Sequence, residues 1–393
     1  MNENDDSALQ ALAGSAWDVA VVGAGPAGAM AAHELARLGA TVLLVDKSRF
    51  PRYKVCGCCL NGRALSVLDA VGLGGLVDRH GGLPLDTFQL AAAGRSARMK
   101  LPRGAALSRE VFDAAMADAA VTEGARFVPE CRASLKEGTR DRWTVSLRRG
   151  EVSVEVSARV VLAADGLGQK LLNTADTFES RPAESARIGA GVMLDDRAGE
   201  FAPGVIYMAA GTGGYVGLVR VEGNRLNVAA ALDPAAVREH GGPGPVAAAI
   251  VNDSGLETPD GLADANWRGT PGLTRRASRV SAHRFLVLGD AAGYVEPFTG
   301  EGMAWALSAG REVAPIVYGA LETFDRITER TWARRYRAVT GSARWRCRVI
   351  AAGLRRPGLV KAATIALGRM PALAAPVIGR LNAGVSSGKE MRS

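Results

Sequence analysis

One stretch near the amino end restricts the fold more than any other part of the chain. Residues 17–46 read WDVAVVGAGPAGAMAAHELARLGATVLLVD. The stretch holds an apolar strand, a glycine turn, a helix of small residues and a second apolar strand that ends in an acid. Short apolar runs on either side of a segment with helical composition predict a βαβ unit.

The glycines of this turn form a GxGxxG motif made by Gly23, Gly25 and Gly28. Glycines without side chains let backbone amides at a helix amino terminus approach a pyrophosphate. Asp46 follows Gly28 by 18 residues at the end of the second strand, where its carboxylate can accept hydrogen bonds from ribose hydroxyls. The pattern predicts a dinucleotide site, with a tight structural turn as the alternative, and does not separate NAD from FAD.

A second glycine-rich segment lies far downstream, at residues 285–310, FLVLGDAAGYVEPFTGEGMAWALSAG. It resembles the second FAD motif of the superfamily that contains geranylgeranyl reductases and aromatic hydroxylases. The resemblance implies that Asp290 contacts the ribityl and pyrophosphate part of FAD, and that the loop from Pro297 through Gly300 and Gly302 to Met303 lies along the flavin. Gly300 and Gly302 also open a helix, whose free amides and dipole would stabilise negative charge on a reduced flavin.

Three further segments extend the resemblance over most of residues 16–310. Arg109, in LSREVFDAAMADAA, matches a family arginine that precedes a helix and contacts the cofactor; the alternative is a solvated charge at a helix start. Asp165 and Gly166 match a motif tied to cofactor and pyridine-nucleotide contact. Gln169 and Leu172 depart from the hydroxylase pattern there, which weakens the case for stable NAD(P)H binding. The family implies non-covalent FAD, with NAD(P)H or another reductant as a transient electron donor.

The predicted fold class is α/β, with an α+β second domain. A Rossmann-type FAD-binding domain would carry an inserted antiparallel-sheet substrate domain and a helical carboxyl-terminal region. The boundaries follow changes of pattern along the sequence. They are a disordered leader at 1–15, the FAD-binding domain at 16–175 and 281–325, the substrate domain at 176–280 and the basic helical region at 326–393.

The segment PRYKVCG resembles a geranylgeranyl reductase signature near the flavin, and it leads into the unusual sequence CGCC. A Cys56 thiolate beside a flavin could act as a redox or acid/base group, whereas small thiols that pack beside the ring are the plainer interpretation. Tyr215 is the second candidate catalytic residue, and Tyr207 and Met208 are candidate pocket-lining residues. No second Cys or His pair accompanies CGCC, so no metal site is predicted.

Two reactions fit such a flavin. A monooxygenase would hydroxylate a hydrophobic aromatic or polyketide-like compound through a C4a-hydroperoxide, and a reductase or dehydrogenase would act on carbon–carbon double bonds of a lipid-like substrate. Gly217, Val219 and Arg220 stand where the isoprenoid reductases carry Trp, Phe and Pro, although Asn227 and Val228 are kept. This departure favours the monooxygenase, with the reductase second and a non-catalytic flavin-containing assembly protein third.

The net charge of +8 is unevenly distributed, because residues 326–393 contain 15 Lys and Arg against Glu329 and Glu390. Apolar stretches are interleaved with these charges, which favours a solvated helical face first, peripheral membrane contact second and nucleic acid a distant third. The five cysteines are an odd number, and the first fifteen residues lack a signal-peptide pattern. We therefore expect a cytoplasmic protein with reduced thiols, a hydrophobic small-molecule substrate, no nucleic-acid partner and membrane association as the open alternative.

Overall fold

The computed structural model describes residues 3–168, 171, 178, 180–195, 199–296 and 300–382. Its largest sheet joins segments that are distant in sequence, in the order β19 (Ser281–Ala282), β20 (Phe285–Val287), β11 (Val152–Ala163), β1 (Ala16–Val22), β2 (Val42–Val45) and β8 (Arg126–Val128). The pairs from β20 to β8 are parallel, and their strands are largely buried. Both the amino-terminal and downstream segments of the predicted FAD-binding domain therefore enter one sheet.

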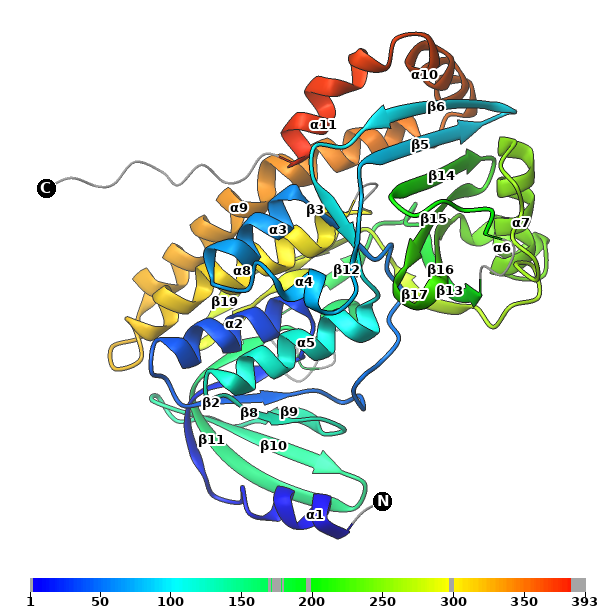
Figure 1. The fold of residues 1–393 in the computed structure, drawn as a ribbon. Helices are drawn as coiled ribbons and strands as arrows, with labels where there is room; N and C mark the ends of the chain where they lie inside the picture. The colour runs from blue at the N-terminus through cyan, green and yellow to red at the C-terminus, as the bar shows by residue number, and fades with distance from the viewer. Residues whose placement is uncertain are drawn as a thin grey trace, which may run out of the picture.

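Helices cover this sheet and connect its strands. α2 (Pro26–Arg37) follows β1 and packs against α8 (Glu301–Tyr318) and α5 (Arg109–Thr122). On the far side, β11 continues into an antiparallel extension with β10 (Trp143–Arg149) and β9 (Arg132–Lys136) (Figure 1). β20 leads into the short helix η4 (Gly289–Ala292), and β11 leads into η1 (Gly166–Gly168).

A second sheet stands beside the first (Figure 1). Its strands run in the order β17 (Arg268–Gly272), β13 (Ile188–Asp195), β16 (Arg225–Leu232), β15 (Gly214–Val221), β14 (Val205–Gly211), β5 (Thr87–Ala92) and β6 (Arg95–Lys100). Neighbouring strands are antiparallel, except for the parallel pair of β14 and β5. η3 (Glu222–Asn224) links β15 to β16, and α6 (Pro234–Glu239) and α7 (Pro243–Ser254) follow β16. α7 packs against β14 and β15.

Two small sheets and two short helices complete the region between the larger sheets. The three-stranded sheet contains β3 (Cys59–Asn61), β7 (Gly104–Ala106) and β4 (Leu83–Pro84), and the two-stranded sheet contains β12 (Ser180–Pro182) and β18 (Arg275–Ala277). α3 (Gly62–Ala70) begins directly after β3, with Asn61 as its amino-terminal cap, and α4 (Leu76–Arg79) follows. β3 thus holds the end of the CGCC segment next to α8.

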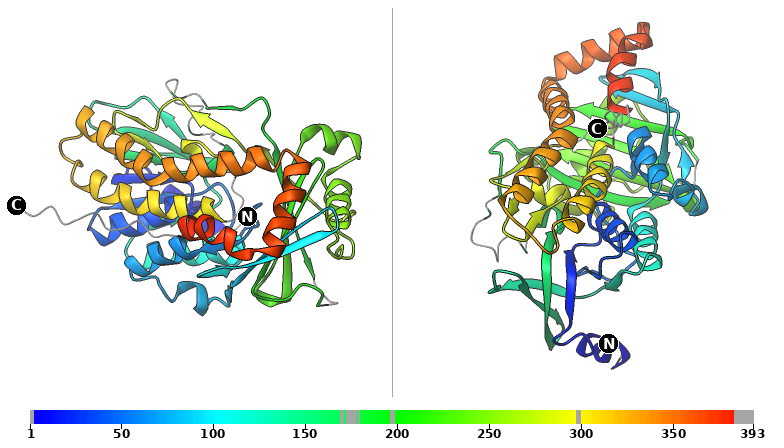
Figure 2. Two further views of the ribbon diagram at one scale, coloured as in Figure 1. Left: turned by 90° about the horizontal axis from the view of Figure 1, so that it is seen from above. Right: turned by 90° about the vertical axis from the view of Figure 1, so that its left-hand side faces the viewer.

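The carboxyl-terminal region is helical, as the sequence predicts. α9 (Arg326–Gly353) runs along α8, then α10 (Pro357–Arg369) crosses over β5 and β6, and η5 (Pro371–Ala374) and α11 (Ala375–Asn382) turn back (Figure 2). Asp325 begins α9 by accepting hydrogen bonds from the amides of Ile327 and Thr328. Pro357 is at the first turn of α10, where its missing N–H costs nothing.

Two features of the predicted domain organisation are wrong. Residues 3–10 form α1 (Glu3–Gln10) rather than part of a disordered leader, because Leu9 and Leu12 are buried in the core beside β11. Strands β5 and β6, residues 87–100, belong to the substrate-domain sheet and not to the FAD-binding domain. They are held there by pairing with β14, more than 100 residues downstream.

Candidate functional site

The three glycines of the turn between β1 and α2 have different structural roles. Gly23 has φ +107°, and a Cβ there would overlap the Ala164 carbonyl; a Cβ on Gly28 would overlap the Gly23 carbonyl. Both are glycines because backbone packs against them. A Cβ on Gly25 would instead point into a pocket, 3.6 Å from Nη2 of Arg109. Gly25 therefore keeps open the space at the start of α2 that a phosphate would occupy.

Asp46 fixes the turn from the end of β2. Its Oδ2 accepts a hydrogen bond of 2.9 Å from the Ala24 amide, and its Oδ1 accepts one of 2.9 Å from the Ser48 amide. The Arg52 guanidinium lies 3.7 Å from the same carboxylate. Asp46 therefore orients the glycine turn while one edge of its carboxylate lines the pocket.

Arg109 is buried, and not the solvated charge that was the alternative. Ser108 caps α5, which places Arg109 at the first helical position, and its guanidinium donates two hydrogen bonds of 2.7 Å to Asp113 one turn later. Arg52 lies 3.1 Å from the same Asp113 carboxylate. Two guanidinium groups thus share one buried acid, and the surplus positive charge faces the pocket.

The AspGly motif follows β11 as predicted and faces a lysine. Gly166 has φ +71°, and a Cβ on it would lie 3.1 Å from Nζ of Lys54. Asp165 Oδ2 accepts a hydrogen bond of 3.0 Å from the Leu171 amide, which closes the turn. Burial, with the charges of Arg109 and Arg52, lowers the pKa of Lys54. Gln169 and Leu172 lie outside the described residues.

The second glycine-rich segment closes the other side of the pocket. Asp290 lies in η4, half-buried, and Gly300, Gly302 and Met303 bring the start of α8 to the same pocket. Gly300 has φ +75°, and a Cβ on it would lie 2.7 Å from the Cys59 carbonyl oxygen. The start of α8 can therefore approach the CGCC segment only because residue 300 is a glycine. Pro297 lies outside the described residues.

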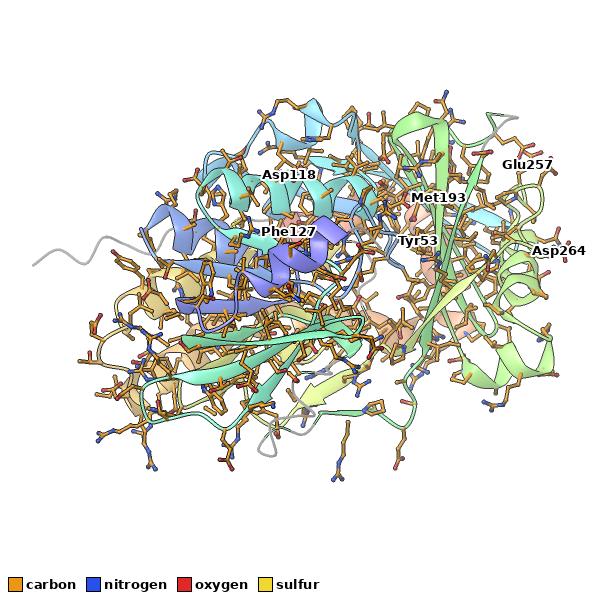
Figure 3. The ribbon with its side chains drawn as sticks, turned by 90° about the horizontal axis from the view of Figure 1, so that it is seen from below. Tyr53, Asp118, Phe127, Met193, Glu257 and Asp264 are labelled. Carbon is orange, nitrogen blue, oxygen red and sulfur yellow. The ribbon has the colours of Figure 1, made fainter. Side chains whose placement is uncertain are left out.

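These segments line one cavity of about 470 Å³ between the two large sheets. The predicted site residues that line it are Gly23, Gly25, Asp46, Cys56, Arg109, Asp165, Gly166, Tyr215, Asp290, Gly300, Gly302 and Met303. Gly28 supports the turn from behind. Figure 3 labels Tyr53 where the two parts of the molecule meet, and the Arg268 guanidinium of β17 lies 5.3 Å from its ring centre. The cavity therefore has walls from both domains.

The thiols of CGCC have different environments. Cys56 is half-buried at the cavity, and its carbonyl accepts a hydrogen bond of 2.9 Å from Asn227 on β16. A hydrogen bond from the Cys58 thiol, together with the Arg109 guanidinium, lowers the pKa of Cys56 to about 6. Burial and the neighbouring Cys56 raise the pKa of Cys59 well above its usual value. The two thiols therefore differ in acidity, because Cys56 loses its proton more readily than an ordinary thiol and Cys59 less readily.

The second sheet places alternate side chains on opposite faces. Met208 and Tyr215 line the cavity, as predicted. Tyr207 does not: its ring packs edge-on against Phe201, with 5.1 Å between ring centres, on the face that α7 covers. The reason is the two-residue period of a strand, which sends neighbours 207 and 208 to opposite sides. Burial, and then the charge of Glu296, raises the pKa of Tyr215, so its hydroxyl stays protonated.

Three pocket residues were not singled out from the sequence: Arg52, Tyr53 and Lys54. Their signal was present in PRYKVCG, where two cations lie four and two residues before the cysteine of the family-like CysGly pair. Arg52 Nε and the Tyr53 hydroxyl are buried without a hydrogen-bond partner within the described residues. The Tyr53 hydroxyl lies against Gly191 of β13, whereas Arg52 lies beside Gly25. An unpartnered donor of Arg52, next to an open glycine cradle and a second guanidinium group, fits a dinucleotide with a pyrophosphate.

A second cavity of about 360 Å³ adjoins the first and is lined almost entirely by aliphatic side chains. Its walls come from β5, β6 and β14 on one side and from α9, α10, η5 and α11 on the other. Cys59 and Ile206 line both cavities. The apolar cavity therefore shares a wall with the site of the glycine motifs.

Fold and site together define a dinucleotide-binding protein with an adjacent apolar cavity. Residues 16–316 match the family model described as FAD binding domain, so the chain belongs to this family and is an FAD-dependent oxidoreductase. The residues above fit this cofactor. Gly25, Arg52 and Arg109 would hold its pyrophosphate, Asp46 its ribose, and the start of α8 its flavin.

Among curated proteins, the chain is 29% identical to a menaquinone reductase of Mycobacterium tuberculosis over 336 residues, 76% of each chain. It is 28% identical to a digeranylgeranylglycerophospholipid reductase of Methanothermobacter thermautotrophicus over 327 residues, 78% of each chain. A flavoprotein/dehydrogenase from Cytophaga hutchinsonii has the same fold, with a TM-score of 0.77 at 19% identity over 94% of this chain and 93% of that one. So does a p-nitrophenol 4-monooxygenase from Pseudomonas putida, with a TM-score of 0.75 at 15% identity, over 94% and 99%.

No helix of the described residues is both long enough and apolar enough to cross a membrane.

Proposed function

We propose that this enzyme saturates a carbon–carbon double bond in a lipid-like substrate with a long hydrocarbon chain. The observation that carries the proposal is the apolar cavity and the wall it shares with the flavin pocket at Cys59 and Ile206. A hydrocarbon chain in this cavity would bring one segment of its length to that wall. The remaining chain would lie between the second sheet and the carboxyl-terminal helices.

The cavity suits a chain better than a compact aromatic ring. Its lining is mostly aliphatic, with Leu85 from the segment before β5, Leu90 from β5 and Val360 from α10, and it has few polar groups that could orient a ring. One of these groups, Asn61, already caps α3. Apolar surface without positioned donors favours a ligand that binds by area and shape alone.

The relatives support the same choice. Two curated proteins that match three quarters of the chain are named as reductases, one of menaquinone and one of a digeranylgeranyl lipid. The loss of the isoprenoid signature still sets this chain apart. Gly217 lines the flavin pocket, and the side chain of Met208 lies 3.4 Å from where its Cβ would be. Met208 therefore occupies space that a larger residue at position 217 would need.

The reaction needs a hydride, a proton and a source of electrons. When bound and reduced, FAD supplies a hydride to one alkene carbon, and the other carbon takes a proton, so that two electrons saturate one double bond. Cys59 and Tyr215 are two pocket groups whose raised pKa keeps them protonated at neutral pH. Cys59 is the better placed of the two, because it lines both cavities.

The Cys56 thiolate has a different role. Its charge lies beside Arg109 and lowers the surplus positive charge of the pocket. The electrons come from NAD(P)H or another reduced carrier that binds transiently. The cofactor itself is held without a covalent bond.

The test compares products made under two atmospheres. The holoenzyme is reduced with dithionite in the absence of oxygen. It is then mixed with a menaquinone that has a prenyl side chain or with a geranylgeranyl lipid, and the masses of the products are measured by mass spectrometry. We expect products that gain two hydrogens. Products that gain an oxygen atom, in air with NAD(P)H and only then, would instead support the hydroxylation favoured by the sequence pattern.

A further inference from the structure

The apolar cavity reaches the surface between α10 and η5. Leu359 and Leu373 both line it, yet their side chains are 52% and 55% exposed. A residue that is at once cavity wall and protein surface marks an entrance. Seen from above, the end of α9, α10 and α11 surround this side of the molecule in a U shape (Figure 2).

A third large apolar side chain stands beside this entrance. Met370, between α10 and η5, is 59% exposed. We call Leu359, Met370 and Leu373 the mouth patch. Exposed apolar residues that occur singly need no explanation, but two that line an apolar cavity and a third between the elements that carry them make this opening apolar.

The segment that carries the mouth patch has charge of one sign. Residues 341–382 contain eight Lys and Arg and no Asp or Glu. Arg356, Lys361 and Arg369 are exposed on or at the ends of α10, the helix that carries Leu359. Apolar side chains ringed by cations are complementary to a surface with hydrocarbon inside and negative charge outside, which describes an anionic bilayer.

We propose that the mouth patch docks on an anionic lipid surface and that the apolar cavity takes its substrate directly from the bilayer. The proposal rests on the proposed function for the identity of the cargo, but the docking itself does not. With the mouth patch at the headgroups, a hydrocarbon chain would pass from lipid to cavity without entering water. The flavin pocket lies beyond the shared wall at Cys59.

The experiment measures flotation of the full-length holoenzyme with vesicles of phosphatidylcholine containing phosphatidylglycerol. The mouth variant carries Leu359→Ser, Met370→Ser and Leu373→Ser. Its matched control carries Ile327→Ser and Val121→Ser, which remove exposed apolar side chains elsewhere. Ile327 is on α9, 23 residues or about 35 Å along the helix from the cavity residue Ile350.

A second pair of variants changes only charge. The first carries Arg356→Gln, Lys361→Gln and Arg369→Gln. Its control carries Arg326→Gln, Arg330→Gln and Arg337→Gln, three exposed cations in the first half of α9. FAD content and melting temperature, measured for all four variants, establish that each is folded.

We expect the mouth variant and the first charge variant to bind the anionic vesicles about tenfold or more weakly, and both controls to bind as the parent does. Binding by the parent should weaken with salt and on vesicles of phosphatidylcholine alone. Equal losses in variants and controls, or no flotation of the parent, would overturn the docking. Vesicle binding without hydrogenation would defeat the proposed function alone, and hydrogenation in detergent without vesicle binding would defeat the docking alone.

Discussion

The flavin pocket and the apolar cavity share a wall but are constructed in opposite ways. In the pocket, function depends on single atoms: the Asp46 carboxylate holds the Ala24 amide, and Arg109 is fixed by two bonds to Asp113. In the cavity, Leu90 and Val360 contribute only surface. A substitution in the pocket should therefore have a large effect on FAD binding. A substitution in the cavity should affect substrate binding in proportion to the change in side-chain volume.

The largest effect is expected at the glycine turn. Gly23→Ala should lower the free energy of unfolding by about 3 kcal/mol or more and abolish FAD binding, because the new Cβ overlaps the Ala164 carbonyl. Gly14→Ala is the control, since Gly14 also has a positive φ but nothing within 4 Å of its Cβ. It should cost about 1 kcal/mol from backbone strain alone. Chemical denaturation gives the free energy of unfolding of each variant, and flavin fluorescence gives its FAD binding. Equal losses of stability in Gly23→Ala and Gly14→Ala would contradict the overlap with the Ala164 carbonyl.

Next comes the carboxylate of η4. Asp290→Ala should weaken FAD binding at least about tenfold, since hydrogen bonds to a charged group are among the stronger ones, and leave the fold intact. Asp264→Ala, an exposed acid beyond α7, is the control and should bind FAD as the parent does. Titration of the apoprotein with FAD measures the affinity of each variant. An alanine variant with unchanged affinity would remove Asp290 from the site.

The cavity should respond to volume and not to charge. Ala374→Phe in η5 places a ring where a hydrocarbon chain would lie, so the KM for a long-chain lipid should rise about tenfold while FAD content is unchanged. Ala372→Phe, an exposed position in the same element that does not line the cavity, should leave KM unchanged. If both variants have the parent's KM, the chain does not bind there.

Cys56 should give the smallest effect on folding. Cys56→Ser should lower activity severalfold with nearly unchanged FAD content and melting temperature. In the parent protein, the pKa of the Cys56 thiol is about 6, below the usual thiol value. The thiolate is therefore present above pH 6 and is lost as the pH falls through 6. Alkylation by iodoacetamide should follow that midpoint. Cys131, whose pKa is raised by burial to about 11, should not react at neutral pH, and a parent that alkylates only above pH 8 would contradict the assignment.

The sequence predicts the pocket far better than the cavity. Gly25, Asp46 and Asp290 are readable because a phosphate or a carboxylate contact needs one residue type at one place in a strand–turn–helix unit. The fold class, the family and FAD are confirmed; the contact of each residue with FAD stays a prediction. By contrast, Tyr207 and Met208 could not be told apart, because the pattern gives alternation but not which face meets the flavin domain.

The cavity has no local signature at all. Phe88 in β5, Ile206 in β14 and Leu367 in α10 meet only through long-range pairing and packing. Apolar residues at such positions are found in any buried helix or strand, so they do not indicate a cavity. The same limit explains why β5 and β6 were assigned to the wrong domain and why α1 was taken for a disordered leader.

We propose that a hydrocarbon chain in the apolar cavity delivers a double bond to the flavin. The most direct measurement is anaerobic: the holoenzyme is reduced, mixed with a prenyl-chain lipid in a stopped-flow instrument, and followed at the absorbance of oxidised flavin. Oxidised flavin should return without oxygen, at a rate that rises with lipid concentration and falls in Ala374→Phe. Flavin that stays reduced until oxygen is admitted, with every lipid tried, would contradict this proposal.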